Sequence, residues 1–508
     1  MNRICPRFLP MLWLSLCMVG SVLAQEGSSP NVLIVTVDDM SCDSIGVYGC
    51  GVSDTTPTMD EFAKTAMKFE KAHVLVGNCM PGRNLMWSGL YSHVNGVEGF
   101  RQNPDPDYPV LCDLAKDAGY FTGIRGKVNH STPYVPYAWD AVLDQDASGK
   151  AYHKKDARSF GESTKRGIDM ARQAGKPFCL VVNISDPHKP FYTQGYSEKK
   201  TDPHVPTKVF DADDVVVPGF LFDDPAVRDE LAIYYSSVRR ADDAFASILK
   251  ALQESGQADD TFVMFLSDHG MPLPFAKTQL YHHSTRTPLM VRWPGVTEAA
   301  DVDDDHFVSA IDFLPTLLDV MRAKHPTPER LHGRSFAPLL RGQTQRGRDH
   351  VVKQYNENSG RNRHPMRAIQ NEKWLYIYNP WSNGERVFAT ATNGTATARR
   401  MREIAKSDSA MAKRVDVYDH RTVEELYLVS EDPDCRKNLI GSASAANERG
   451  LLRAMLAKEL ERIDDPVAPL LKDVEDDDLR EAFMAVEDAK SEALKKAKPK
   501  KRAKRKAA

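Results

Sequence analysis

Four short apolar runs rich in β-branched residues set the strongest limit on how this chain folds. They occupy residues 31–39, 178–184, 262–266 and 289–292. Helical patterns lie beside them, at residues 58–66, 111–118, 161–174 and 226–255. Continuous apolar runs are typical of strands that are buried on both faces, and strands that alternate with helices favour a parallel sheet. We therefore expect an α/β fold, a mainly parallel sheet flanked by helices.

After about residue 334 the pattern changes. Residues 364–370 and 374–379 alternate between apolar and polar side chains, which predicts antiparallel strands. Helical patterns follow at residues 391–414 and 444–463. This part of the chain is expected to form a smaller α+β subdomain that packs on the first.

Composition divides the 508 residues into four parts. Residues 1–24 carry two arginines before a short apolar run and end in small residues, as a secretory signal does. Residues 25–340 would form the catalytic α/β domain and residues 341–488 the C-terminal subdomain. The tail, 489–508, has ten Lys and Arg residues against one acid, which predicts a disordered segment. An arm that binds polyanions is the alternative for this tail.

The composition excludes several classes of protein. A hydrophobic content of 42% rules out a disordered chain, and a net charge of −3 gives no chain-wide basic excess for nucleic acid. Beyond the signal, no segment approaches the roughly 20 apolar residues that span a membrane. Six cysteines remain after the signal, too few for a disulfide framework, and their pairing cannot be read from sequence. We expect an exported protein, periplasmic or secreted, or lysosomal in a eukaryote.

Acids and imidazoles follow three of the apolar runs. They are Asp38 and Asp39, Asp186 and His188, and Asp268 and His269. The carboxyl ends of parallel strands meet at one edge of a sheet, where ligands bind. A single acid pair could be a helix cap or a turn, but repetition at three strand ends favours a site for a hard divalent cation.

The residues around Cys79 are suited to binding an anion. Pro81, two residues later, is favoured in the first turn of a helix, so Cys79 is expected near a helix N-terminus. Free backbone N–H groups and the helix dipole there bind anions and lower the pKa of a thiol. Arg83 would add a fork of donors for an oxyanion. A lone cysteine is otherwise most often a small buried hydrophobe.

The segment Cys79-x-Pro81-x-Arg83, continuing to Ser88-Gly89, resembles the signature of the sulfatases. Further segments in order extend the resemblance over most of the chain: Asp38-Asp39, Gly126-Lys127, Asp186-Pro187-His188, Ser267-Asp268-His269-Gly270, Ile311-Asp312-Phe313-Leu314-Pro315-Thr316, Glu425-Leu426-Tyr427, Asp432-Pro433 and Asn438-Leu439. The family's fold is of the alkaline-phosphatase type. Residues 270–275, 278–281 and 365–367 are similar to heparan N-sulfatases (sulfamidases), whereas Asp268-His269 and residues 126–130 look more like iduronate-type sulfatases.

The resemblance implies two cofactors. The family's cysteine is oxidised to formylglycine, so a formylglycine-generating enzyme would convert Cys79. The resemblance also assigns the metal ligands, which are Asp38, Asp39, Cys79, Asp268 and His269. Calcium is the usual ion, and the imidazole of His269, which stands where an amide is commoner, leaves magnesium and manganese as alternatives.

The same resemblance assigns catalytic roles. Arg83 would steady the oxyanion of the hydrated aldehyde, and Lys127 and Lys277 would contact sulfate oxygens. His188 is the preferred general acid for the leaving group, and His130 would assist breakdown of the sulfated hydrate. Outside this context Lys277 would be a solvated surface lysine and His130 a structural histidine.

Some residues are weaker candidates. His282 and His283 could line the sugar pocket or lie in a loop, and Arg367 is a possible substrate contact. The expected activity is removal of sulfate from a sulfated saccharide, preferably an N-sulfated glucosamine. Two alternatives remain, a phosphonate or phosphate ester hydrolase with the same site, and a pseudoenzyme that binds sulfated glycan without cleaving it.

Overall fold

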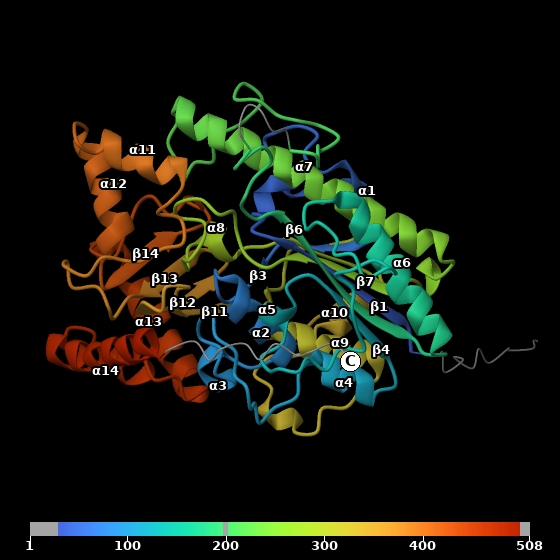
Figure 1. Ribbon diagram of the computed structural model, residues 1–508. Helices are drawn as coiled ribbons and strands as arrows, with labels where there is room; N and C mark the ends of the chain where they lie inside the picture. Colours follow the sequence, from blue (N-terminus) through green and yellow to red (C-terminus); the bar gives the residue numbers. More distant parts are fainter. Residues whose placement is uncertain (1–28, 197–201, 498–508) are drawn as a thin grey trace, which may run out of the picture.

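The computed structural model describes residues 29–196 and 202–497, so the expected signal lies outside the described residues (Figure 1). Its main sheet has eight strands in the order β5-β4-β6-β1-β7-β8-β2-β9. In that order they span Ala141–Val142, Phe121–Arg125, Phe178–Pro187, Asn31–Asp38, Thr261–Ser267, Leu289–Arg292, Met67–Phe69 and Val302–Asp303. β5, β4, β6, β1 and β7 run parallel, and β8 is antiparallel to both of its neighbours. The predicted α/β architecture is confirmed.

Side-chain alternation along β1 explains why both faces of the sheet are covered. Leu33 and Val35 enter one hydrophobic core, and Val32 and Ile34 enter the other. The first core is closed by α1 (Pro57–Ala63), α6 (Ala157–Gln173) and α7 (Pro225–Glu254). The second is closed by α2 (Cys79–Ser88), α4 (Leu111–Asp117) and α9 (Phe313–Met321), which lie on the opposite side of the sheet in Figure 1. A strand buried on both faces reads as a continuous apolar run.

The C-terminal part forms a second, antiparallel sheet in the order β11-β12-β13-β14. Its strands span His350–Glu357, Arg363–Asn371, Trp374–Tyr378 and Glu424–Leu428. Helices α13 (Ala446–Arg462) and α14 (Asp477–Lys496) contact this sheet, and α11 (Ala396–Ile404) contacts α7 of the main domain. The predicted α+β subdomain is therefore present beside the main sheet.

Two helical predictions differ from the structure. The single helix expected over residues 391–414 is two helices, α11 and α12 (Ser409–His420). Asp408 begins the second one, because its side chain accepts a hydrogen bond from the backbone N–H of Met411 as an N-cap does. The tail expected to be disordered from residue 489 is helical up to Lys496, since its Lys, Ala and Glu residues are strong helix formers that continue α14. Residues 498–508 lie outside the described part.

The described residues contain no helix long and apolar enough to cross a membrane. Within the same residues every cysteine is a free thiol, so no disulfide joins the two sheets there. Noncovalent contacts join the C-terminal subdomain to the main domain, among them the packing of α11 on α7 and the ion pair of Arg400 with Asp224.

Candidate active site

Helix α2 places Cys79 at the carboxyl edge of the main sheet. Cys79 is the first residue of the helix and Pro81 lies in its first turn, as expected. Every residue of α2 is buried, and Cys79 is only 2% exposed. Its Sγ lies 3.2 Å from His269 Nε2 and 3.5 Å from Asp38 Oδ1. The thiol therefore touches the predicted metal ligands directly.

Three carboxylates converge because β1 and β7 are neighbouring parallel strands. Their register pairs Val37 with Ser267, so the residues that follow, Asp38 and Asp268, lie side by side. Asp39 has a left-handed backbone conformation (φ 71°), and its N–H donates to Asp268 Oδ1 over 3.1 Å. All three carboxylates are at most 1% exposed. Buried carboxylates at this density require cations.

The structure supplies three cationic side chains around these acids. Lys127 Nζ lies 2.5 Å from Asp38 Oδ2, and Lys277 Nζ lies 2.7 Å from both oxygens of Asp39. Arg83 Nη2 lies 3.0 Å from Asp268 Oδ2. The cluster thus contains as many cationic side chains as carboxyl side chains.

Arg83 is held more rigidly than the two lysines. It is completely buried, and its Nε donates to Asp268 Oδ2 over 3.0 Å. Its Nη1 donates to Thr36 Oγ1 over 2.8 Å and to Asn183 Oδ1 over 2.5 Å, so β1 and β6 both fix its position. This arrangement makes Arg83 a fixed cationic support beneath Cys79.

Three histidines, His269, His188 and His130, border the cluster, and backbone carbonyls orient the first two. His269 Nε2 lies 3.1 Å from Asp39 Oδ1, and its Nδ1 lies 2.9 Å from the carbonyl oxygen of Gly270. His188 Nδ1 lies 2.6 Å from the carbonyl oxygen of Lys189. Each carbonyl fixes a proton on Nδ1, which leaves the Nε2 lone pair of both rings available.

Burial and neighbouring charge shift the pKa values in the cluster. Burial alone raises the pKa of Asp39, but Lys277 and the nearby histidines outweigh it and lower the value to about 2. Burial lowers the pKa of His188, and burial together with Lys127 lowers that of His130 to about 3. At neutral pH Asp39 is therefore ionised and these two histidines are neutral.

The pKa of Cys79 moves against the expectation from its helix position. Burial raises the pKa of the thiol, and Asp38 and Asp268 raise it further, whereas Lys127 and Lys277 lower it only in part. Cys79 is therefore a protonated thiol in this environment, which is a poor nucleophile.

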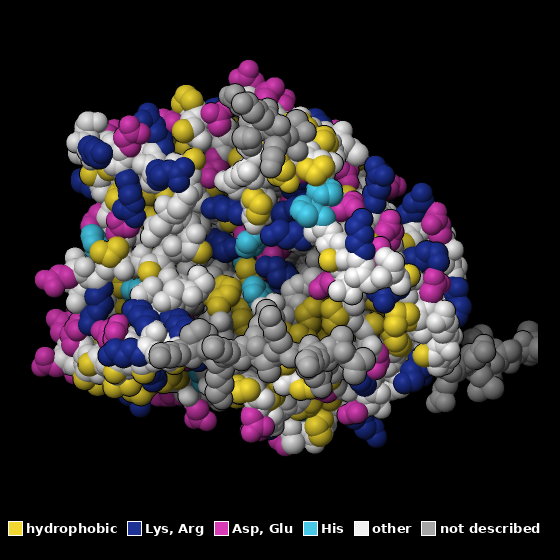
Figure 2. Space-filling view, viewed as in Figure 1, with side chains coloured by type: hydrophobic (Ala, Val, Ile, Leu, Met, Phe, Trp, Pro, Cys, Tyr) yellow, Lys and Arg dark blue, Asp and Glu magenta, His cyan; other side chains and the backbone are white. Residues whose placement is uncertain are grey.

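A cavity of about 260 Å³ opens over the cluster. Its lining consists of Asp39, Asn78, Cys79, Phe100, His130, His188, Lys189, Pro272, Lys277, Ser359 and Ala391. Figure 2 shows Lys, Arg and His side chains gathered around a hollow near the middle of this face. The last two lining residues come from the C-terminal subdomain, so both parts of the chain build the cavity.

The ten predicted site residues all lie in or directly beneath this cavity. Five line it, and Asp38, Arg83, Asp268 and His269 form the buried layer below, which the half-buried Lys127 contacts through Asp38. Sequence reasoning missed Asn78 and Lys189, although each is adjacent to a predicted residue. Ser359 and Ala391 lie in irregular segments of the C-terminal subdomain, and no local pattern marks them.

Other candidates lie elsewhere. Asp186 follows the expected strand but pairs with Lys155 (2.7 Å) and Arg240 (2.7 Å), so these cations and not the Cys79 cluster occupy its carboxylate. Arg367 is 1% exposed and pairs with Asp465 over 2.6 Å, so the suggested substrate contact is wrong.

His282 and His283 also lie outside the cavity lining. His282 Nδ1 is 2.9 Å from the side-chain nitrogen of Gln370, and His283 Nε2 is 3.1 Å from Asp434 Oδ1. Both rings therefore take part in packing, and they also contact Asp43, His73 and Phe220 from the first half of the chain.

Known proteins share both the sequence and the fold. The profile of the family described as Sulfatase matches residues 30–323, and that described as N-sulphoglucosamine sulphohydrolase, C-terminal, matches residues 268–385. The human N-sulphoglucosamine sulphohydrolase is 28% identical over 472 residues, which cover 86% of this chain and 91% of the human protein.

Solved structures agree on the architecture. A structure described as a 2-O GAG sulfatase superposes with a TM-score of 0.64 at 20% identity, over 86% of this chain and 93% of that one. The phosphonate monoester hydrolase of Agrobacterium radiobacter gives a TM-score of 0.59 at 18% identity, over 85% and 96% of the two chains. At these identities the likeness concerns the fold, which is the predicted alkaline-phosphatase type.

Proposed function

Because this chain belongs to the sulfatase family of enzymes, we propose that it removes the sulfo group from N-sulfated glucosamine of a heparan-like glycan. The observation that carries the proposal is the position of Cys79. Its Sγ lies within 3.5 Å of Asp38 and His269, at the floor of a cavity lined by Lys277, His130 and His188. A nucleophile, a cation site and anion-binding groups thus share one cavity.

The buried cluster fits a divalent cation. Potential ligand atoms of Asp38, Cys79, Asp268 and His269 all lie within 4.8 Å of one another, and Asp39 adds a third carboxylate. The Nε2 lone pair of His269 points at these acids, where a cation would satisfy it. We propose calcium as the ion, with magnesium or manganese as alternatives. Such an ion lowers the pKa of a nucleophile bound to it.

Because the unmodified Cys79 thiol is protonated, we propose that residue 79 becomes a nucleophile only after conversion to formylglycine. A thiol whose pKa is raised by burial gives little thiolate for attack. The hydrated aldehyde instead supplies a diol nucleophile, which needs neighbouring cations to lose its proton. Arg83 and Lys127 lie beside this position and would stabilise the negative charge. A formylglycine-generating enzyme is therefore the proposed maturation partner.

The remaining residues would hold the sulfo group and manage protons. Lys277 and Lys127 each contact a carboxylate, and both are near enough to the cavity to exchange that partner for sulfate oxygens. His188 would donate a proton to the departing amine or hydroxyl, and His130 would assist product formation. A bound sulfo group raises the pKa of a nearby imidazole, so the substrate itself would favour the protonated His188 that this role needs.

The size of the cavity bears on the kind of substrate. About 260 Å³ lies below the ~300–1,000 Å³ typical of small-molecule sites, which favours one terminal sugar over the interior of a chain. The match of residues 268–385 to the C-terminal part of N-sulphoglucosamine sulphohydrolase supports an N-sulfated sugar.

We further propose export and a tail that binds polyanions. Residues 1–24 have the pattern of a secretory signal, and residues 498–508 hold most of the basic tail; both lie outside the described residues. Retention on immobilised heparin by the full chain, but not by a chain ending at Ala497, would support the tail's role. Ending the chain there keeps α14 whole, whereas a cut before Lys490 would remove part of it.

Sulfate release from N-, 2-O- and 6-O-sulfated monosaccharides tests the main proposal. The protein is produced together with a formylglycine-generating enzyme, and the mass of the peptide containing residue 79 is measured. We expect release from the N-sulfated sugar and loss of release in Cys79→Ala. Cys112→Ala, which changes a buried cysteine in α4, is the matched control and should stay active.

Other outcomes would identify the alternatives. Faster turnover of phosphodiesters or phosphonate esters than of any sulfated sugar would assign the chain to the first alternative, whose fold it shares. An unmodified thiol at position 79 together with glycan binding and no sulfate release would indicate a pseudoenzyme.

A further inference from the structure

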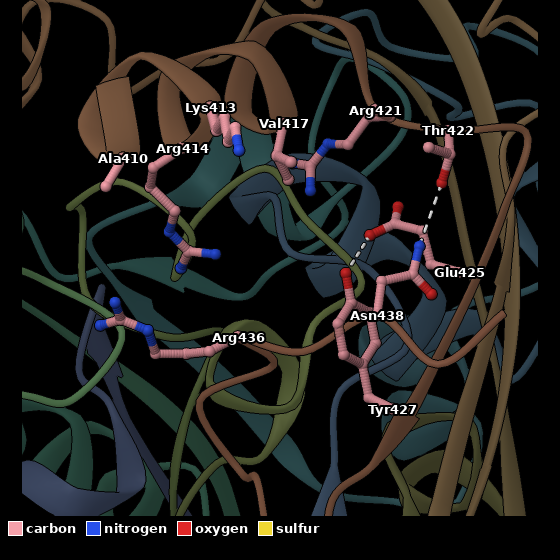
Figure 3. Close-up of a pocket in the computed structure, with 10 residues that line it drawn as sticks. All are labelled: Ala410, Lys413, Arg414, Val417, Arg421, Thr422, Glu425, Tyr427, Arg436 and Asn438. Atoms are coloured by element: carbon pink, nitrogen blue, oxygen red, sulfur yellow. Dashed lines mark hydrogen bonds between the residues drawn. The ribbon is translucent and has the colours of Figure 1, made fainter. Parts of the chain in front are cut away.

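A second basic cavity lies in the C-terminal subdomain, between α12 and β14 (Figure 3). It has a volume of about 250 Å³, and we call it the α12 cavity. Lys413, Arg414, Arg421 and Arg436 line it, and Figure 3 shows their side chains directed into a common space. None of them belongs to the active site described above.

These four cations lack acidic partners. Within residues 29–196 and 202–497, no Asp or Glu oxygen lies within 4.0 Å of their charged nitrogens. The one carboxylate in the lining, Glu425, is occupied by neutral donors: Tyr427 Oη (2.5 Å), Tyr281 Oη (2.7 Å) and Asn379 Nδ2 (2.7 Å). The α12 cavity thus has an uncompensated positive charge, unlike the balanced cluster at Cys79.

Neutral groups hold the guanidinium groups in place. Arg414 lies over the ring of Phe275, 3.6 Å from its centroid, and donates to the carbonyl oxygen of Phe220 over 3.2 Å. Arg436 donates to the carbonyl oxygen of Gly219 over 2.6 Å. The positions of both groups are therefore set before any ligand arrives, which reduces the entropy lost on binding.

Arg421 is the buried member of the set. It is 7% exposed, contacts Tyr281 and Gln279, and has a buried Nε with no hydrogen-bond partner among the described residues. An unpartnered buried N–H of a charged group is costly. Burial lowers the pKa of Arg421, and burial together with Arg436 lowers that of Arg414 to about 10. An anion in the cavity would satisfy the unpartnered N–H and would stabilise the charged forms of Arg421 and Arg414.

We propose that the α12 cavity binds a tetrahedral oxyanion, a sulfate or phosphate group. Arg414 from α12, Arg421 from the turn after it and Arg436 from the loop after β14 approach from separate segments, an arrangement that suits several oxygens in three dimensions better than one planar carboxylate. An adjoining cavity shares Arg414 and Arg436 and is lined by Phe220, Phe222 and Phe275. A free anion and a sulfo group on a larger molecule are both accommodated.

Calorimetric titration of the full chain with inorganic sulfate, inorganic phosphate and N-sulfated glucosamine tests the proposal. Lys277→Gln is used as the background because it weakens anion binding in the active site. We expect one remaining site, whose affinity falls about tenfold or more in Arg436→Gln and in Arg414→Gln, as loss of a charge-assisted hydrogen bond predicts. Arg436 is exposed, so its substitution tests the site even if the Arg414 variant folds poorly.

Arg449→Gln is the matched control, because Arg449 in α13 also donates to a backbone carbonyl, that of Ile440. Its substitution should leave binding unchanged. Binding of free sulfate or phosphate would identify the anion itself as the ligand, and binding of the sulfated sugar alone would identify a glycan subsite. No binding by any of the three, or equal binding in the Arg436 variant, would overturn the proposal.

Discussion

At the carboxyl edge of the parallel sheet, Arg83, Lys127 and Lys277 face three buried carboxylates within about 3 Å. In the α12 cavity, four cations have no carboxylate within 4.0 Å among the described residues. Lysine and arginine side chains therefore have different roles in the two regions, because they pair with acids in the first and have no acidic partner among the described residues in the second. A cation added to the first cluster competes with its lysines for the acids and makes them available to an anion, whereas the α12 cavity is ready for an anion without any metal.

Metal removal should separate the two regions most strongly. Dialysis against a chelator should lower sulfate release by at least about a thousandfold, since the ion contributes several kcal/mol to the transition state. Readdition of calcium should restore activity. Anion binding to the α12 cavity should stay unchanged, which titration of the chelated protein checks. Full activity after verified metal removal would contradict the proposed cation site.

A pair of lysine substitutions sharpens the comparison further. Lys277→Ala should lower kcat about 100- to 1,000-fold, as loss of one preorganised group at developing charge does. Lys413→Ala, which removes an exposed lysine of the α12 cavity, should leave kcat within about twofold. Steady-state kinetics on the N-sulfated sugar provides the measurement. Similar losses in both variants would mean that the two regions act as one.

A final prediction concerns pH. His188 must be protonated to act as an acid, and burial lowers its pKa in the free enzyme, so kcat/KM should rise as pH falls below the ordinary range of imidazole. The carboxylate of Asp39, with a pKa of about 2, stays ionised over that interval. His188→Gln should lower kcat about 100- to 10,000-fold and flatten the profile. An unchanged slope in this variant would assign the proton to another group.

The sequence allowed the central sheet and the buried cluster to be predicted because both follow from local patterns. Apolar runs marked the strands, and parallel pairing of β1 with β7 brought Asp38 next to Asp268. Asp186 had the same strand-end position, but Lys155 from the segment before α6 and Arg240 from α7 pair with it. Partners that come from distant segments leave no signal in the sequence around Asp186.

The α12 cavity could not be predicted for the same reason. Its arginines come from a helix, a turn and a loop, and Phe275, which supports Arg414, lies far away in the sequence. Arg367 shows the opposite error, since a motif suggested a substrate contact while Asp465, 98 residues away, pairs with it in the interior. Long-range pairing decides whether an arginine binds a ligand or stabilises the fold.

The depth at which Cys79 lies also restricts when it can be modified. A side chain 2% exposed, on a helix whose residues are all buried, is out of reach for another enzyme once α2 has packed against the sheet. The proposed oxidation must therefore take place on the extended chain, during synthesis or transport. Molecules that fold before oxidation would keep the thiol permanently. The active fraction of a preparation would therefore depend on the rate of oxidation relative to the rate of folding.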